Sequence, residues 1–149
     1  MGSLRLFLDA SVFIAAAGSP EGGSSMVLKL CQQRHFQALC TRLVLLEAER
    51  NVSRKLGREP LLRFYRTLAE LEPLLIPLPP VDEIAACVPI VGEKDAHVLA
   101  ADLKGEADVL LTLDRKHFMT EKVRDARLVL KIVTPGDFLR ELVTTEDQT

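Results

Sequence analysis

The sequence predicts a single α/β domain built on a mostly parallel sheet, and three features of the chain support this. Short apolar runs of strand length alternate with segments whose apolar residues recur at helical spacing. The first run, residues 4–8, has too little polarity for a strand with one face in water, so we expect both of its faces to be covered. Helices between successive strands form β-α-β units, in which the strands run parallel with right-handed crossovers.

The first half of the chain is expected to hold three strands and four helices. The strands are predicted at residues 4–8, 36–40 and 74–78, and the helices at 11–17, 24–34, 42–56 and 61–71. Turn formers at 18–23 separate the first two helices. Thr41 is a suitable N-cap for the third helix, and Gly57 ends it. The fourth helix has the apolar spacing of a buried face, with Leu61, Phe64, Tyr65 and Leu68.

The second half continues the same alternation after Pro79 and Pro80 stop the third strand. We predict helices at 81–88, 94–104 and 121–126, a loop at 89–93, a turn at 116–118, strands at 108–113 and 128–133, and a last helix after Pro135. Gly105 is the expected end of the second of these helices. The chain then forms one domain over residues 1–143, followed by a flexible C-terminal tail at 144–149.

Composition limits the classes of protein that the chain can belong to. With 149 residues, 48% of them apolar, it is long enough for one domain with a substantial core. The net charge of −2 argues against a protein coated in basic residues. No apolar run approaches the roughly 20 residues that span a bilayer, and the start lacks a signal-peptide pattern, so we expect a cytoplasmic protein. Cys31, Cys40 and Cys87 fit no zinc spacing and are expected to be buried reduced thiols.

Acidic residues follow two of the predicted strands, at Asp9 and Asp114. Because the carboxyl ends of parallel strands meet at one edge of the sheet, where ligands bind, we expect both carboxylates at that edge. Asp95, in the first turn of its helix, can point sideways into the same crevice. Glu47 lies in the second turn of another helix; Glu49 is close by, and periodicity does not choose between them.

Such a cluster of carboxylates is typical of a metal site. Crowded carboxylates repel and raise one another's pKa unless a divalent cation neutralises them. Mg²⁺ or Mn²⁺ prefers oxygen ligands, and it can activate water and stabilise the leaving oxygen in phosphodiester hydrolysis. The competing interpretation of each acid is a turn former or helix cap. The three histidines belong to no recognisable nucleophile motif, so no other hydrolytic machinery is indicated.

Four stretches, taken in order, resemble a PIN-domain ribonuclease. They are Asp9-Ala-Ser11, Thr41 with Glu47 six residues later, the segment 95–101, and the segment 111–114 followed by Phe118. The Thr-Pro-Gly-Asp-Phe-Leu stretch at 134–139 is similar to the last helix of a PIN subgroup. The resemblance covers nearly the whole chain, and it implies a three-layer α/β/α fold with a five-stranded parallel sheet.

The resemblance also implies an activity: cleavage of RNA that depends on Mg²⁺ or Mn²⁺. Asp9, Asp95 and Asp114 would hold the ion, Glu47 would help to bind it or position water, and Ser11 would orient Asp9 or a metal-bound water. Thr112 would help in the same way. Many relatives of the VapC toxin type have a further Asp before the phenylalanine, and this chain has His117 instead. That departure bears on a second metal site more than on the first.

The expected role is the toxin of a toxin–antitoxin pair, with RNA as substrate, an antitoxin protein as partner and a homodimer formed through residues 26–31 and 61–71. The alternatives are an RNA-processing factor, or a scaffold with weak nuclease activity that acts by binding a partner protein. A haloacid-dehalogenase-type phosphatase is disfavoured, because Ser11 stands where its second acid would be.

Several other polar residues receive weaker expectations. Asp102 is predicted to be solvated or salt-bridged, and His117 can lie near the site. The basic residues of 50–66 either form ordinary solvated helix faces or a rim that binds RNA phosphates, and Arg115 has the same two interpretations.

Overall fold

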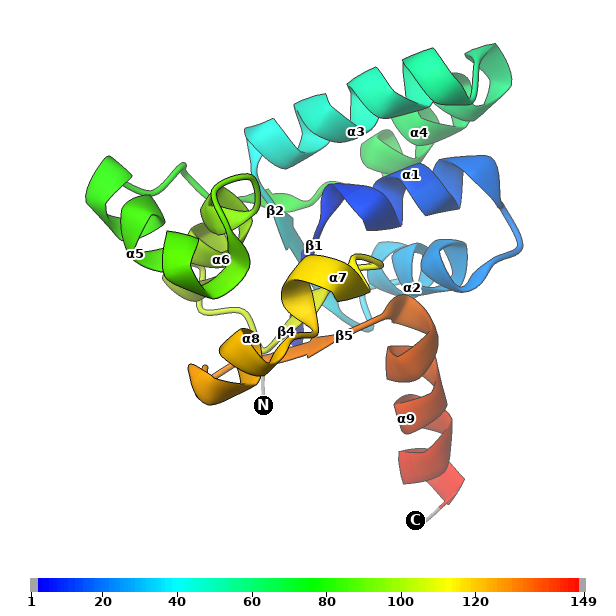
Figure 1. Ribbon diagram of the computed structural model, residues 1–149. Coiled ribbons are helices and arrows are strands. Elements are labelled where there is room, and N and C mark those ends of the chain that lie inside the picture. The colour runs from blue at the N-terminus through cyan, green and yellow to red at the C-terminus, as the bar shows by residue number, and fades with distance from the viewer. Residues whose placement is uncertain (1–2, 148–149) are drawn as a thin grey trace.

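A five-stranded parallel sheet lies at the centre of the computed structural model, which describes residues 3–147 (Figure 1). The strands are β1 (Arg5–Leu8), β2 (Gln37–Cys40), β3 (Leu74–Leu75), β4 (Val109–Leu111) and β5 (Lys131–Val133). Their order is β3-β2-β1-β4-β5, and every neighbouring pair is parallel. Leu6, Phe7 and Leu8 of β1 have no exposed surface, so this strand is covered on both faces as its composition predicted.

Helices cover the two faces of the sheet and complete three α/β/α layers, which confirms the predicted fold class. Their bounds are α1 (Ala10–Gly18), α2 (Gly23–Gln32), α3 (Arg42–Lys55), α4 (Arg58–Leu71), α5 (Val81–Val91), α6 (Ala96–Lys104), α7 (Arg115–Phe118), α8 (Glu121–Asp125) and α9 (Pro135–Asp147). Helices α1 to α4 pack against one another, with α9 on α2. Helices α5, α6 and α8 form the second group, on the other side of the sheet (Figure 1).

Helix caps account for the sharp boundaries around α3. The Thr41 hydroxyl accepts a hydrogen bond from the amide of Val44 (3.1 Å), so Thr41 is the N-cap that the sequence predicts. Gly57 separates α3 from α4 with a φ of 95°, a left-handed conformation that favours glycine. These two residues fix where α3 begins and where the chain turns back into α4.

Several predicted boundaries differ from the structure, and β3 and β5 are both shorter than the strands predicted at 74–78 and 128–133. Helix α5 continues through Pro89 to Val91, so the predicted loop at 89–93 is wrong in its first part. Burial of Cys87 and Val91 against the core stabilises this last turn in spite of the missing proline amide, and Gly92 ends it. Strand β4 is shorter than predicted, which leaves Asp114 three residues beyond its end. Helix α9 extends to Asp147 and therefore includes part of the predicted tail at 144–149; residues 148 and 149 lie outside the described residues.

The core contains two kinds of buried titratable group. Cys31, Cys40 and Cys87 are free and buried, as predicted, and burial raises the pKa of the first two thiols to about 12. Asp102 of α6 is fully buried, and neither carboxyl oxygen has a hydrogen-bond partner among the described residues, so the prediction of a solvated or salt-bridged side chain is wrong. Burial raises the pKa of this carboxyl to about 8. Within residues 3–147, no helix is both long enough and apolar enough to cross a membrane.

Candidate metal centre

The loops that leave β1 and β4 meet at the point where the strand order reverses. The amide of Asp9, directly after β1, donates to the carbonyl of Leu111 at the end of β4 (3.1 Å). The amide of Thr112 donates in turn to the carbonyl of Val133 in β5 (3.2 Å). This is the topological switch point at which parallel sheets bind ligands, and it brings residues about 100 positions apart into contact.

Asp9 is held at this point by three hydrogen-bond donors. Its Oδ1 accepts from the amide of Ala10 (2.8 Å), which makes Asp9 the N-cap of α1. Its Oδ2 accepts from the hydroxyls of Thr112 (2.7 Å) and Ser11 (3.1 Å). The carboxylate is buried and fixed in orientation by groups from two separate loops.

The two hydroxyls also bind the segment that carries Asp114. Ser11 Oγ accepts from the amide of Leu113 (3.0 Å), and Thr112 Oγ1 accepts from the amide of Asp114 (3.1 Å). Ser11 therefore lies against Asp9, where the sequence resemblance placed it, and Thr112 makes the shorter contact. Both side chains join the loop after β1 to the loop after β4.

Asp95 stands at the N-terminus of α6, but its side chain makes no cap hydrogen bond. The residue is only 8% exposed, and its Oδ2 has no hydrogen-bond partner in the part of the chain that the structure describes. Burial raises the pKa of this carboxyl, and the nearby charges of Asp114 and Asp9 raise it further. The charges of His117 and Lys94 act in the opposite direction. The Asp95 carboxylate is thus a buried hydrogen-bond acceptor whose Oδ2 has no donor among the described residues, and it lies near the charges of Asp9, Asp114 and His117.

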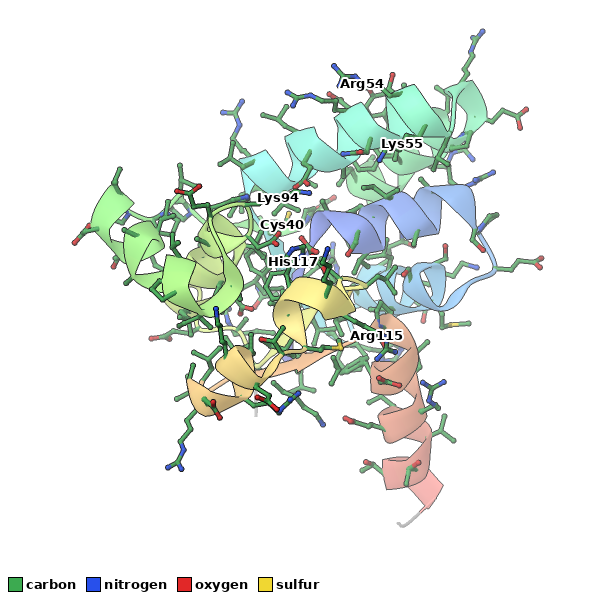
Figure 2. All side chains as sticks on the ribbon, in the orientation of Figure 1. Cys40, Arg54, Lys55, Lys94, Arg115 and His117 are labelled. Carbon is green, nitrogen blue, oxygen red and sulfur yellow. The ribbon has the colours of Figure 1, made fainter. Side chains whose placement is uncertain are left out.

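Asp114 and His117 form the remaining side of the centre. Asp114 Oδ1 accepts from the amide of His117 (3.1 Å) and so caps the short helix α7. The ring Nδ1 of His117 lies 2.8 Å from Asp114 Oδ2 and 3.7 Å from Asp95 Oδ2. In Figure 2, His117 projects from α7 toward the space between α1 and α6. One ligand atom from each of Asp95, Asp114 and His117 lies within 4.8 Å of the other two.

These residues fit a divalent metal ion. A buried carboxylate oxygen with no donor is costly unless a cation or a proton satisfies it, and Asp95 Oδ2 is such an atom. Carboxylate oxygens suit hard ions such as Mg²⁺ and Mn²⁺. Asp95, Asp114 and His117 can supply ligands directly, and the charge of Asp9 is close enough to act on Asp95.

The structure does not bring Glu47 into this group. Its side chain is half-buried on α3, and none of the hydrogen bonds found among residues 3–147 joins it to the three aspartates. Glu49, the neighbour that the sequence could not separate from it, lies close enough to Tyr65 on α4 to raise the pKa of that side chain. Of the two glutamates, Glu47 remains the one without such a partner on α4.

His117 is the residue whose place sequence reasoning underestimated. In the sequence, His117 stands where many related proteins have an aspartate, so it receives little weight. In the structure its ring lies beside Asp95 and Asp114. The available signal was the spacing of three residues from Asp114, which returns a side chain to the same side of a helical turn.

Comparisons with known proteins identify the family and the fold that carry this centre. A family model described as PIN domain matches residues 5–116. PAE2754 from Pyrobaculum aerophilum is similar in structure, with a TM-score of 0.64, 20% identity and coverage of 95% of this chain and 96% of that one. VapBC2 from Rickettsia felis, in a structure with a DNA fragment from their promoter, has a TM-score of 0.62 and 17% identity, covering 88% and 98%. At such identities the two structures establish the fold, and no curated protein matches the chain significantly.

Proposed function

Because the chain belongs to the PIN-domain family, we propose that it is a metal-dependent endoribonuclease that hydrolyses RNA phosphodiester bonds. The observation that carries this proposal is the convergence of Asp9, Asp95 and Asp114 at the switch point, with the buried Oδ2 of Asp95 lacking a donor. The convergence carries more weight than the missing donor, because within the described part of the chain the buried carboxyl of Asp102 also lacks donors but has no charged group acting on it.

In this proposal Asp9, Asp95 and Asp114 hold one Mg²⁺ or Mn²⁺ ion. When bound, such an ion activates water and stabilises the leaving oxygen without a nucleophilic side chain. Ser11 and Thr112 keep the Asp9 carboxylate in a fixed orientation. That arrangement removes the need to reorganise the site when substrate arrives.

Glu47, on α3, is proposed to help bind the ion or to position water. Its half-buried side chain and its place on the helix that starts directly after β2 support this role. Because it makes no hydrogen bond to the aspartates, its contribution is expected to be smaller than theirs.

RNA phosphates are proposed to contact basic side chains around the centre. Lys94 is exposed and close enough to Asp95 to lower the pKa of its carboxyl. Arg54 and Lys55, in the last turn of α3, lie farther from the centre, as Figure 2 shows, and would contact phosphates further along the RNA. Cations at these places favour a polyanion, and binding should weaken as salt concentration rises.

The toxin of a toxin–antitoxin pair is the biological role that we propose within this activity. The similar structure from Rickettsia felis is that of VapBC2 with promoter DNA, and we extend to this chain the idea of an antitoxin partner and a cytoplasmic RNA target. A homodimer belongs to the same proposal. Light scattering on the purified chain measures the dimer, and co-purification with the product of a neighbouring small gene tests the partner.

The activity is tested with a mixed-sequence RNA incubated with Mn²⁺ or Mg²⁺. We expect the wild type to cleave it, EDTA to stop cleavage, and Asp9→Asn to be inactive, because Asp9 is a proposed ligand. The matched control is Asp125→Asn, the same substitution at an exposed position on α8. Circular dichroism must show equal folding. Cleavage that survives EDTA, or that Asp9→Asn retains in full, would overturn the proposal.

A further inference from the structure

His117 occupies a position from which an imidazole can reach the proposed ion. Its Nδ1 lies 2.8 Å from Asp114 Oδ2 and 3.7 Å from Asp95 Oδ2. One ligand atom from each of Asp95, Asp114 and His117 lies within 4.8 Å of the other two, so the three atoms can share one ion after small side-chain movements.

The backbone and one contact of the ring hold His117 at the centre. Its amide donates to Asp114 Oδ1, and the neighbouring Phe118 is 1% exposed, which anchors α7 to the core. The His117 side chain itself is 44% exposed, so it is free to adjust around a ligand. The ring is therefore positioned by the backbone and by its contact with Asp114 Oδ2, and a bound ion would replace that contact.

A nitrogen donor changes which ions a carboxylate site prefers. Mg²⁺ is a hard ion that takes oxygen ligands and water, whereas imidazole suits the first-row transition ions. Affinity for a mixed nitrogen and oxygen site rises from Mn²⁺ to Co²⁺ along the first row. A site with His117 in place of a further carboxylate also carries one negative charge fewer, which weakens its attraction for any hard ion.

We propose that His117 is a ligand of the ion at this centre, and that it makes the site prefer first-row transition ions such as Mn²⁺ and Co²⁺ to Mg²⁺. This inference rests on the proposed function, since it assumes that the carboxylates bind a metal. It adds the identity of a nitrogen ligand and the resulting metal preference.

Pulsed electron paramagnetic resonance with Mn²⁺ tests the ligand directly, without any reading of activity. We expect nitrogen modulation from a bound imidazole in the wild type and its loss in His117→Asp and His117→Gln. The control is His35→Asn. His35 is exposed and lies just before the start of β2, at the edge of the sheet opposite the candidate metal centre. His117→Gln remains informative if the extra charge of His117→Asp disturbs α7.

Calorimetry with Co²⁺ and with Mg²⁺ tests the preference. Loss of the imidazole ligand in His117→Asp should lower the Co²⁺ affinity by about tenfold or more. The same variant should keep or improve the affinity for Mg²⁺. The ratio of the Co²⁺ affinity to the Mg²⁺ affinity should therefore fall by about tenfold or more. A wild type that binds Mn²⁺ without nitrogen modulation, modulation that persists in His117→Asp, or an unchanged ratio would each overturn the inference. If Asp9→Asn still abolishes metal binding in those cases, the proposed function stands; if the wild type binds no metal, both fail.

Discussion

Helix α6 carries two buried aspartates that differ in their surroundings. Asp95, at its N-terminus, lies in the candidate metal centre, whereas Asp102, two turns later, lies in the core. Burial raises the pKa of both carboxyls. Asp95 faces the charges of Asp9, Asp114 and His117, whereas burial is the only cause acting on Asp102. A buried acid therefore marks a functional centre only when other charged groups converge on it.

The largest expected effect concerns Asp102 and pH. Its pKa is about 8 in the folded chain and near the ordinary 3.8 in the unfolded chain. As pH rises from about 4 to 8, the unfolded state loses this proton first, so the free energy of unfolding should fall by as much as about 5 kcal/mol. Asp102→Asn, which resembles the protonated acid, should remove this slope and be the more stable protein at pH 8.

Urea denaturation at pH 5 and pH 8 measures this difference, with Asp125→Asn as the exposed control. The wild type and Asp125→Asn should lose stability together over this interval. If Asp102→Asn loses as much stability as they do, the carboxyl does not keep its proton in the folded core.

The second expected effect separates the two aspartates by activity. Asp95→Asn removes a proposed ligand and should lower RNA hydrolysis and Mn²⁺ affinity by about a hundredfold or more, on the order of 3 kcal/mol. Asp102→Asn, on the same helix, should leave both within about twofold at pH 7. Initial rates on a defined RNA and calorimetry provide the two readings. Equal losses in both variants would place Asp102 in the site or Asp95 outside it.

The smallest expected effect is on stability without metal. Asp95→Asn gives up no hydrogen bond at Oδ2 and relieves repulsion with Asp114, so the free energy of unfolding should stay constant or rise by up to about 1 kcal/mol. Asp9→Asn should instead lower it, because the Asp9 carboxylate accepts from three donors. Thermal melts in EDTA compare the two. A large drop for Asp95→Asn would indicate a structural cap.

The fold was predictable because its determinants are local. The apolar run that forms β1, the Thr41 cap and Gly57 each act within a few residues of themselves, and the structure has all three where the sequence predicts them. The failure at Pro89 has a tertiary cause, since burial of Cys87 and Val91 keeps α5 helical past a residue that locally favours a break.

The site was predictable only in part, because some of its contacts join residues that are far apart in the sequence. Asp9 and Asp114 follow strands whose ends meet, so their proximity could be inferred from β-α-β logic alone. The spacing of three residues places His117 beside Asp114, but the hydrogen bond from Thr112 that brings this loop to Asp9 is encoded by no sequence spacing. Asp102 shares a helix face with Asp95 but lies two turns away, so it is expected to be solvated or salt-bridged, whereas the layers around α6 enclose it. The role of Glu47 stays a prediction.

The hydroxyl contacts that join the two loops also determine how much of the chain must be synthesised before the centre can form. Thr112 reaches Asp9 across 103 positions of the chain, and His117 follows five residues later. A nascent chain that ends before β4 contains Asp9 and Asp95 but lacks the partner strand, both hydroxyl bridges to it and Asp114. The carboxylates can therefore meet only after the chain has been synthesised as far as Asp114, so the centre assembles well after the strand that precedes Asp9.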